Sequence, residues 1–207
     1  MLKTVLITGA SRGLGKAIAD EFAMYGSDYD LILHCRENPP GLGNWVYGDL
    51  RSRDTIANLA DVAKEKNIDI LINNAGVYFN RPFSEITDKE LQEMLDVNLF
   101  APILLTKAIW PIFKKKRSGI VMNINSIAGK VASDGESAYC ASKYGLRGFS
   151  DSIKFDAARD NIQVLDVYPS AMKTDMMRYR KTWKYLPDPI KTAKLVIKYC
   201  RQGANHV

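Results

Sequence analysis

Residues 3–15 read Lys-Thr-Val-Leu-Ile-Thr-Gly-Ala-Ser-Arg-Gly-Leu-Gly, an apolar and β-branched run that leads into three glycines. The run Thr4 to Thr8 predicts a strand, and the pattern that begins at Gly13 predicts a helix. The glycines permit a sharp backbone turn, and the free N–H groups at the helix start are suited to bind a phosphate. This stretch therefore predicts a strand, a phosphate-binding loop and a helix, in that order.

The rest of the chain repeats the alternation of strand and helix. Further strands are predicted at Asp30 to Cys35, Asn44 to Tyr47, Ile68 to Ile72, Ile120 to Asn125 and Gln163 to Val167. Helices are predicted at Gly13 to Tyr25, Arg53 to Lys66, Asp88 to Lys116, Ser137 to Arg159 and Asp188 to Arg201. Since such alternation produces right-handed crossovers, we expect an α/β fold, a doubly wound Rossmann-type parallel sheet with helices on both faces.

Two local features qualify this prediction. Pro102 and Pro111 lie within the long third helix, so we expect a kink or a break there. The stretch Pro39 to Gly43 is predicted to be a tight connection between two strands.

Length and composition are those of an ordinary globular protein, with 207 residues, 46% hydrophobic and 25% charged. We expect a single domain over residues 1–207. No run of about 18 apolar residues is apparent, which predicts no membrane-spanning helix, and the N-terminus does not resemble a signal peptide. Cys35, Cys140 and Cys200 lie far apart, a pattern that predicts neither disulfides nor a metal site and favours the cytoplasm.

The net charge is +6, part of which comes from the cluster Lys114 to Arg117. A nucleic-acid surface is one interpretation of such a cluster. The stronger interpretation is that cations at the end of a long helix complement its dipole and face water. Because no recognition motif accompanies the cluster, we predict no nucleic-acid partner.

Tyr139 and Lys143 are four residues apart in a predicted helix, so their side chains leave the same face. An ammonium group near a phenol favours the phenolate, which makes the tyrosine a better acid or base near neutral pH. Such a pair is common on exposed helix faces. Its position downstream of the glycine loop is what favours a catalytic role.

The spacing of Gly9, Gly13 and Gly15 resembles that of the short-chain dehydrogenase/reductase family, and further motifs of the family follow in the expected order. They are Asp49 after the third strand, Asn73-Asn74-Ala75-Gly76 after the fourth, Asn98, Ser126 after the fifth, Tyr139 with Lys143, and Pro169 to Thr174 after the sixth. The resemblance covers roughly residues 1–175. The cofactor contacts that it implies are Gly9, Ser11, Arg12, Gly13, Leu14, Gly15, Arg36, Asp49, Leu50, Asn74, Ala75, Gly76, Tyr139, Lys143, Pro169 and Thr174.

The same resemblance implies a catalytic set of Asn98, Ser126, Tyr139 and Lys143. Ser126 would hold a substrate carbonyl oxygen and Tyr139 would deliver a proton to it. Lys143 would lower the pKa of the tyrosine and bind ribose hydroxyls, and Asn98 would interrupt a helix and hold a water. Taken singly, each residue favours a structural role, such as a turn serine or a buried asparagine.

The choice between NAD(H) and NADP(H) depends on the residue at the end of the second strand, where an acidic side chain would bind a ribose 2′-hydroxyl. This chain has His34-Cys35-Arg36 there, with no carboxylate before Glu37, and Arg12 lies in the glycine loop. Two guanidinium groups suit a 2′-phosphate. We therefore favour NADP(H), with NAD(H) left open, and we expect His34 to be structural.

The chain departs from the family pattern in two places. Ser170 stands where the family usually has glycine, so a positive φ would be strained there. The C-terminal part is short, which predicts six strands without a seventh and a reduced lid. Near it lie Tyr168, Met172, Met176, Met177, Tyr179, Trp183 and Tyr185, which either line an apolar pocket or partner surface or simply pack the segment.

These observations favour an NADP(H)-dependent oxidoreductase that acts on a small-molecule carbonyl or alcohol. The alternative is a sensor or scaffold that binds NADP(H) without turnover, which the reduced lid would favour. The helices from Asp88 and Ser137 resemble the pair through which family members form dimers. We therefore expect a homodimer.

Overall fold

Six parallel strands form one sheet in the computed structural model, which describes residues 2–37 and 43–202. They are β1 (Lys3–Ile7), β2 (Tyr29–Cys35), β3 (Asn44–Tyr47), β4 (Ile70–Asn73), β5 (Ile120–Ile124) and β6 (Gln163–Val167). Their order across the sheet is β3-β2-β1-β4-β5-β6. The predicted six-stranded, doubly wound α/β fold is confirmed, with the order reversing direction between β1 and β4, where such sheets bind ligands.

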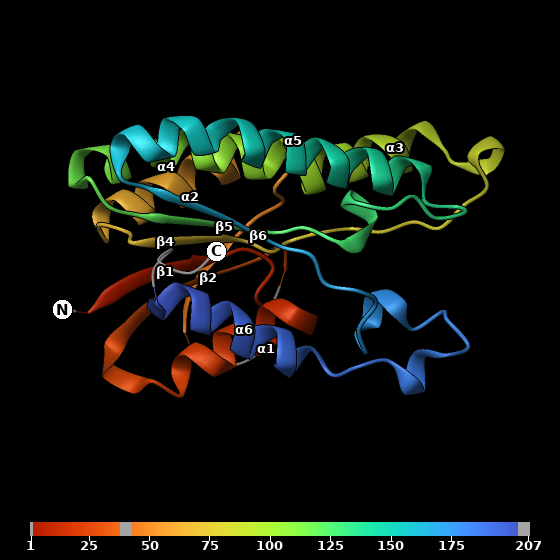
Figure 1. Ribbon diagram of the computed structural model, residues 1–207, viewed down its shortest axis with the longest axis horizontal. Coiled ribbons are helices and arrows are strands. Elements are labelled where there is room, and N and C mark those ends of the chain that lie inside the picture. The colour runs from red at the N-terminus through yellow and green to blue at the C-terminus, as the bar shows by residue number, and fades with distance from the viewer. Residues whose placement is uncertain (1, 38–42, 203–207) are drawn as a thin grey trace.

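Helices cover both faces of the sheet (Figure 1). On one face lie α1 (Gly13–Ala23) and α6 (Pro189–Gln202), and on the other lie α2 (Arg53–Glu65), α4 (Ala101–Lys116) and α5 (Ser137–Asp160), with α3 (Asp88–Leu95) leading into α4. Short 3-10 turns occur at Gly26–Asp28, Phe83–Glu85, Ile127–Gly129, Asp175–Met177 and Trp183–Tyr185. Apart from the predicted third helix, which is divided, the observed strands and helices begin and end within two residues of the predicted bounds.

Alternate strand residues enter two separate cores. Val5 and Ile7 of β1 pack in the cluster beneath α1 and α6, whereas Leu6 between them packs against α2 and α4. All three side chains are fully buried. This explains the continuous apolar runs in the sequence, since a strand covered on both faces has no polar side.

The predicted third helix is divided into three parts. A π-helical turn at Asp96–Phe100 separates α3 from α4, and the carbonyl of Asp96 accepts from the N–H of Ala101, five residues on. The interruption thus precedes Pro102, which lies in the first turn of α4, and α4 continues through Pro111. The predicted kink or break at Pro111 is therefore wrong as regards a break, and a kink there stays a prediction. The run 88–116 is long and apolar enough to cross a membrane by length and composition alone, but Leu105, Ile109 and Phe113 pack in the core.

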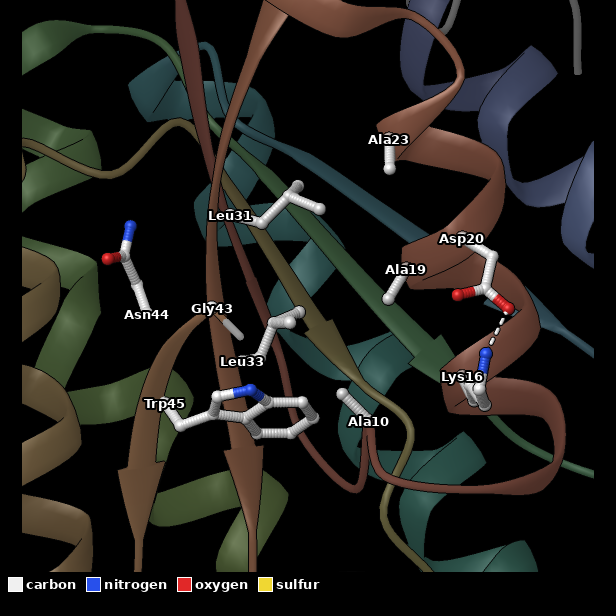
Figure 2. Close-up of a pocket in the computed structure, with 10 residues that line it drawn as sticks. All are labelled: Ala10, Lys16, Ala19, Asp20, Ala23, Leu31, Leu33, Gly43, Asn44 and Trp45. Carbon is white, nitrogen blue, oxygen red and sulfur yellow. Dashed lines mark hydrogen bonds and ion pairs between the residues drawn. The ribbon is translucent and has the colours of Figure 1, made fainter. Parts of the chain in front are cut away.

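Only eight residues, 36–43, connect the parallel strands β2 and β3. Parallel neighbours usually need a crossover of about a dozen residues or more, most often with a helix. Beside α1, a cleft of about 360 Å³ lies over this part of the sheet (Figure 2). Its lining includes Leu31, Leu33 and Trp45, the α1 residues Ala19 and Ala23, and the Lys16–Asp20 ion pair. None of the four predicted catalytic residues lines it. The predicted tight connection at Pro39 to Gly43 lies, except for Gly43, outside the described residues.

The basic cluster at the end of α4 takes part in the structure of this helix end. Lys116 donates to the carbonyls of Asn67 and Ile68, and Lys114 and Arg117 lie 3.7 and 3.6 Å from the carboxylate of Asp160. These contacts support the interpretation of the cluster as a helix end.

Candidate active site

The predicted site residues come together at one edge of the sheet, where the parallel strands end. The glycine loop follows β1, the Asn73–Gly76 motif follows β4, Ser126 follows β5 and Pro169 follows β6. Because β1, β4, β5 and β6 are successive neighbours in the sheet, these four connections are also adjacent. This edge is therefore the candidate active site.

Hydrogen bonds join the glycine loop to the motif after β4. The Asn74 side chain donates to the carbonyls of Thr8 and Gly9, at 2.8 and 3.2 Å. In return, the Thr8 hydroxyl accepts from the backbone N–H groups of Asn74 and Ala75, both at 3.0 Å. Gly9 has a φ of +66°, and a side chain on Gly15 would collide with the Gly9 carbonyl and the Asn74 amide. The glycines are needed for the loop to close in this form.

The N-terminus of α1 is suited to an anionic group. Arg12 at the N-cap makes no side-chain capping bond, and the first turn carries no acidic residue. In contrast, α2 and α3 are capped by the side chains of Ser52 and Thr87. The uncapped N–H groups and the helix dipole therefore fit a dinucleotide pyrophosphate. Ser11 and Gly13 belong to this loop, while the Leu14 side chain lies in the core.

At the end of β2, His34 is buried and makes two structural contacts. Its Nδ1 accepts from the N–H of Gly9 at 3.3 Å, and its Nε2 lies 3.0 Å from the carbonyl oxygen of Gly48. Burial lowers the pKa of His34, so the neutral ring fits this pair of contacts. The prediction that His34 is structural is confirmed. Arg12 and Arg36 are exposed, with Arg36 3.3 Å from Glu37.

Asp49 and Leu50 follow β3 and differ in environment. Arg51 donates to both carboxylate oxygens of Asp49, at 2.6 to 3.0 Å, and this contact lowers the pKa of Asp49. Leu50 is buried in the core beneath α2. Asp49 is thus held in place as a carboxylate at the edge where the resemblance places an adenine ring.

Tyr139 and Lys143 lie together in the first turns of α5, both nearly buried at 9% and 4% exposed. The Lys143 ammonium lies 5.8 Å from the centre of the Tyr139 ring and donates to the carbonyl of Ile124 at 3.0 Å. Ser126 is half-buried at the end of β5, with its hydroxyl accepting from the N–H of Ala128. The predicted proximity of the phenol and the ammonium is confirmed.

The pKa of Tyr139 is shifted in the opposite direction from the expectation. Burial raises the pKa of Tyr139 to about 12, and the Ser126 hydroxyl acts in the opposite direction. The expected net lowering is therefore wrong for this structure, because burial raises the pKa of Tyr139, and Ser126, not Lys143, is the group that opposes it. Burial also lowers the pKa of Lys143 to about 8. Tyr139 is consequently a neutral phenol, and so a proton donor, at neutral pH.

Asn98 lies in the π-helical turn and is fully buried. Its side chain bonds to both the N–H and the carbonyl of Val77, at 2.8 Å each, and donates to the Ser142 hydroxyl at 3.2 Å. Ser142 in turn donates to the carbonyl of Tyr139 at 2.7 Å. The predicted interruption of the helix at Asn98 is confirmed. Pro102 lacks an N–H, so the carbonyl of Asn98 cannot make the usual i+4 bond of an α-helix.

The segment after β6 returns to the glycine loop. The carbonyl of Pro169 accepts from the N–H of Ile127 at 3.0 Å, and the Thr174 side chain lies in van der Waals range of the space above Gly13. Ser170 does not have a positive φ, so the expected strain is absent at this residue.

The aromatic and methionine group near the lid is divided between the two interpretations. Trp183 donates to the carbonyl of Thr174 at 2.9 Å and Met177 is buried, as expected for packing of the segment. Tyr179 instead bonds to Tyr78, which contacts the ring of Tyr139. Only part of the group is thus directed toward the candidate active site.

Sequence reasoning missed several residues that shape this site, namely Thr8, Val77, Tyr78, Glu136, Ser142 and Arg180. Thr8 directly precedes the glycine loop, and a hydroxyl at that position was a usable signal. Val77 contributes only its backbone N–H and carbonyl. The others are polar or aromatic residues in connections or on a helix, and their spacing in the chain indicates nothing about contact.

The chain belongs to the short-chain dehydrogenase family, whose model matches residues 3–185. Members of the family are NAD(P)-dependent oxidoreductases, and that is the class of enzyme to which this fold and site correspond.

Named relatives are reductases and dehydrogenases. The chain is 34% identical over 181 residues to the 3-oxoacyl-(acyl-carrier-protein) reductase FabG of Rickettsia prowazekii, covering 84% of this chain and 74% of that protein. It is also 34% identical over 181 residues to the peroxisomal hydratase-dehydrogenase-epimerase of Saccharomyces cerevisiae, covering 82% of this chain but only 20% of that protein.

Solved structures of similar fold carry either nicotinamide cofactor. A metagenomic short-chain oxidoreductase in complex with NADP matches with a TM-score of 0.83 and 29% identity, covering 99% of this chain and 93% of the other. A 4-hydroxyisoleucine dehydrogenase complexed with NADH matches with a TM-score of 0.85 and 25% identity, covering 99% of this chain and 93% of the other. The family cofactor is thus NAD(P)(H).

Proposed function

We propose that this chain is an NADPH-dependent reductase of a small-molecule carbonyl compound, which also catalyses the reverse oxidation of the alcohol. The observation that carries the proposal is the position of the buried Tyr139 phenol, beside Ser126 and Lys143 where the parallel strands end. A protonated phenol is ready to act as a general acid toward a carbonyl oxygen.

Each residue has a defined task in this mechanism. The Ser126 hydroxyl donates a hydrogen bond to the carbonyl oxygen and orients it. The Tyr139 hydroxyl transfers its proton to that oxygen, and the Lys143 ammonium, 5.8 Å from the ring centre, stabilises the phenolate left behind. The nicotinamide, when bound, supplies the hydride. The carbonyl of Asn98 holds the water through which the proton is replaced.

The preference for NADPH is supported by Arg12 and Arg36. Both are exposed, and the N–H of Ala10 in the glycine loop donates to the carbonyl of His34, so the loop lies along the end of β2. A 2′-phosphate at this place would meet the guanidinium groups of Arg12 and Arg36, and no acidic residue precedes Glu37 at the end of β2.

The test of the reaction follows NADPH absorbance with a panel of aldehydes, ketones, diketones and a 3-oxoacyl thioester. The thioester is included because similar proteins are named 3-oxoacyl-(acyl-carrier-protein) reductases. We expect turnover with at least one of them, and we expect Tyr139→Phe to lower kcat by about a hundredfold to ten-thousandfold while NADPH binding persists. Equal rates for Tyr139→Phe and the wild type would refute the mechanism. Tight NADPH binding without any turnover would instead favour the sensor or scaffold.

The test of cofactor choice compares kcat/KM for NADPH and NADH. We expect Arg36→Ala to reduce the preference for NADPH by about tenfold or more, because a charge-assisted contact is lost. The matched control is Arg53→Ala, at an exposed arginine at the start of α2. An unchanged ratio in Arg36→Ala would count against the NADPH preference.

A further inference from the structure

Four side chains near the catalytic edge form a closed ring of hydrogen bonds. Glu136 accepts from the Tyr78 hydroxyl at 2.6 Å and from the Arg180 guanidinium at 3.2 Å. Tyr179 donates to the Tyr78 hydroxyl at 2.9 Å, and Arg180 Nε donates to the Tyr179 hydroxyl at 3.1 Å. We call these four residues, Tyr78, Glu136, Tyr179 and Arg180, the latch.

The latch joins three separate connections around Tyr139. Tyr78 follows β4, Glu136 directly precedes α5, and Tyr179 and Arg180 lie between β6 and α6. The Tyr78 ring packs edge-on against the Tyr139 ring, with centroids 4.8 Å apart. Tyr179 then stacks on the outer side of Tyr78 at 6.0 Å. Tyr78 thus forms a wall against the catalytic phenol, and the latch supports that wall from outside.

The latch also provides the hydrogen bonds that join residues 175–186 to the rest of the fold. In the described part of the chain, the hydrogen bonds from this segment to residues beyond 170–188 are those of Tyr179 and Arg180. Trp183 and Met177 both donate to the carbonyl of Thr174, which directly precedes the segment. Figure 1 shows the segment between β6 and α6, at the end of the molecule where α5 begins.

The two ends of the latch differ in exposure. Glu136 is 7% exposed, whereas the side chain of Arg180 is 38% exposed. A buried carboxylate that loses its partner is costly, so the closed form is favoured. The solvent-facing side of the latch allows it to open without disturbing the core.

We propose that Glu136 and Arg180 latch residues 175–186 against the wall formed by Tyr78, and that this latch limits the substrate space beside Tyr139 to small carbonyl compounds. Glu136 and Arg180 are then positioning residues, and Tyr78 determines specificity. The claim that the latch limits substrate size rests on the proposed reductase function. The claim that it holds residues 175–186 in place does not depend on that function.

The segment is tested by amide hydrogen exchange on the full chain, without substrate. In Arg180→Ala, we expect residues 175–186 to exchange at least about tenfold faster than in the wild type. The matched control is Arg178→Ala, since Arg178 pairs with Asp175 of the same segment, at 3.3 Å. Arg180→Lys should restore part of the protection. Equal exchange in Arg180→Ala and Arg178→Ala would overturn the proposal.

Substrate size is tested with butane-2,3-dione and its diphenyl analogue. In Arg180→Ala and Tyr78→Ala, we expect the kcat/KM ratio of the bulky to the small diketone to rise about tenfold, chiefly through KM of the bulky one. An unchanged ratio in an active enzyme would overturn the specificity role. If the wild type turns over neither compound nor any other carbonyl, the reductase proposal fails, and hydrogen exchange still decides whether the latch exists.

Discussion

Lys143 places a cationic group in an almost completely buried position of the fold. Burial lowers its pKa from 10.5 to about 8, with Asp166 acting in the opposite direction. The charge therefore opposes folding at neutral pH, although the ammonium donates to the carbonyl of Ile124. If Lys143 has the catalytic role that we propose, the fold keeps this cation at a cost in stability.

This residue-scale argument predicts how stability depends on pH. Between about pH 8 and 10.5 the unfolded chain binds the Lys143 proton and the folded chain releases it, so wild-type stability should rise with pH there. Lys143→Met should remove this rise and add on the order of 3 kcal/mol below pH 8, an advantage that fades by pH 10.5. The measurement is urea denaturation from pH 7 to 10.5.

The control for this prediction is Lys198→Met, at an exposed lysine of α6, which should keep the wild-type pH dependence. A Lys143→Met variant that is less stable than the wild type at pH 7 would show that the hydrogen bond to Ile124 outweighs the buried charge.

At the scale of elements, α1 can begin where it does because Gly15 has no side chain. A Cβ there would lie 2.2 Å from the carbonyl oxygen of Gly9 and 2.4 Å from the Asn74 amide nitrogen. The start of the helix, the glycine loop and the motif after β4 are packed at backbone contact. The geometry of the glycine loop is therefore a property of three elements together.

Two glycine-to-alanine substitutions in helices should act in opposite directions. Gly15→Ala should destabilise the fold by about 2–4 kcal/mol and weaken NADPH binding, because backbone atoms must move. Gly148→Ala in α5, where no atom lies within 4 Å of the added Cβ, should stabilise by up to about 1 kcal/mol. Chemical denaturation and NADPH titration measure both. Similar effects at the two positions would contradict the packing argument.

At the scale of the whole molecule, the layer formed by α4 and α5 exposes large apolar side chains. Tyr144 and Phe155 of α5 and Phe100, which directly precedes α4, are 42%, 74% and 46% exposed. Exposed apolar groups on one helical layer favour association. The homodimer remains a prediction, and this layer is the surface through which we expect it to form.

The dimer prediction is tested by light scattering on the purified chain. We expect a mass of two chains for the wild type and one chain for Phe155→Asp, because a buried charge at the interface would be unpaired. Phe83→Asp is the control, since Phe83 is 81% exposed in a 3-10 turn outside α4 and α5. A wild type that stays monomeric at high concentration would remove the basis for this surface.

The amino-acid sequence alone was enough for the order of elements, the parallel sheet and the positions of Ser126, Tyr139 and Lys143. These properties depend on local patterns: apolar runs such as Ile70 to Ile72, glycines at a strand end, and residues four apart on a helix. Even the interruption at Asn98 was indicated by a motif. Local patterns carry such information because strands and helices depend on near neighbours in the chain.

Tertiary contacts settled the properties that depend on burial and on distant partners. The raised pKa of Tyr139 reflects loss of solvent, which no local pattern encodes. The latch joins Tyr78 to Glu136 and Tyr179, 58 and 101 residues away along the chain. The Asn98 side chain likewise bonds to Val77, 21 residues away along the chain. Folding brings these groups together, so their chemistry could be described only after the chain was seen in three dimensions.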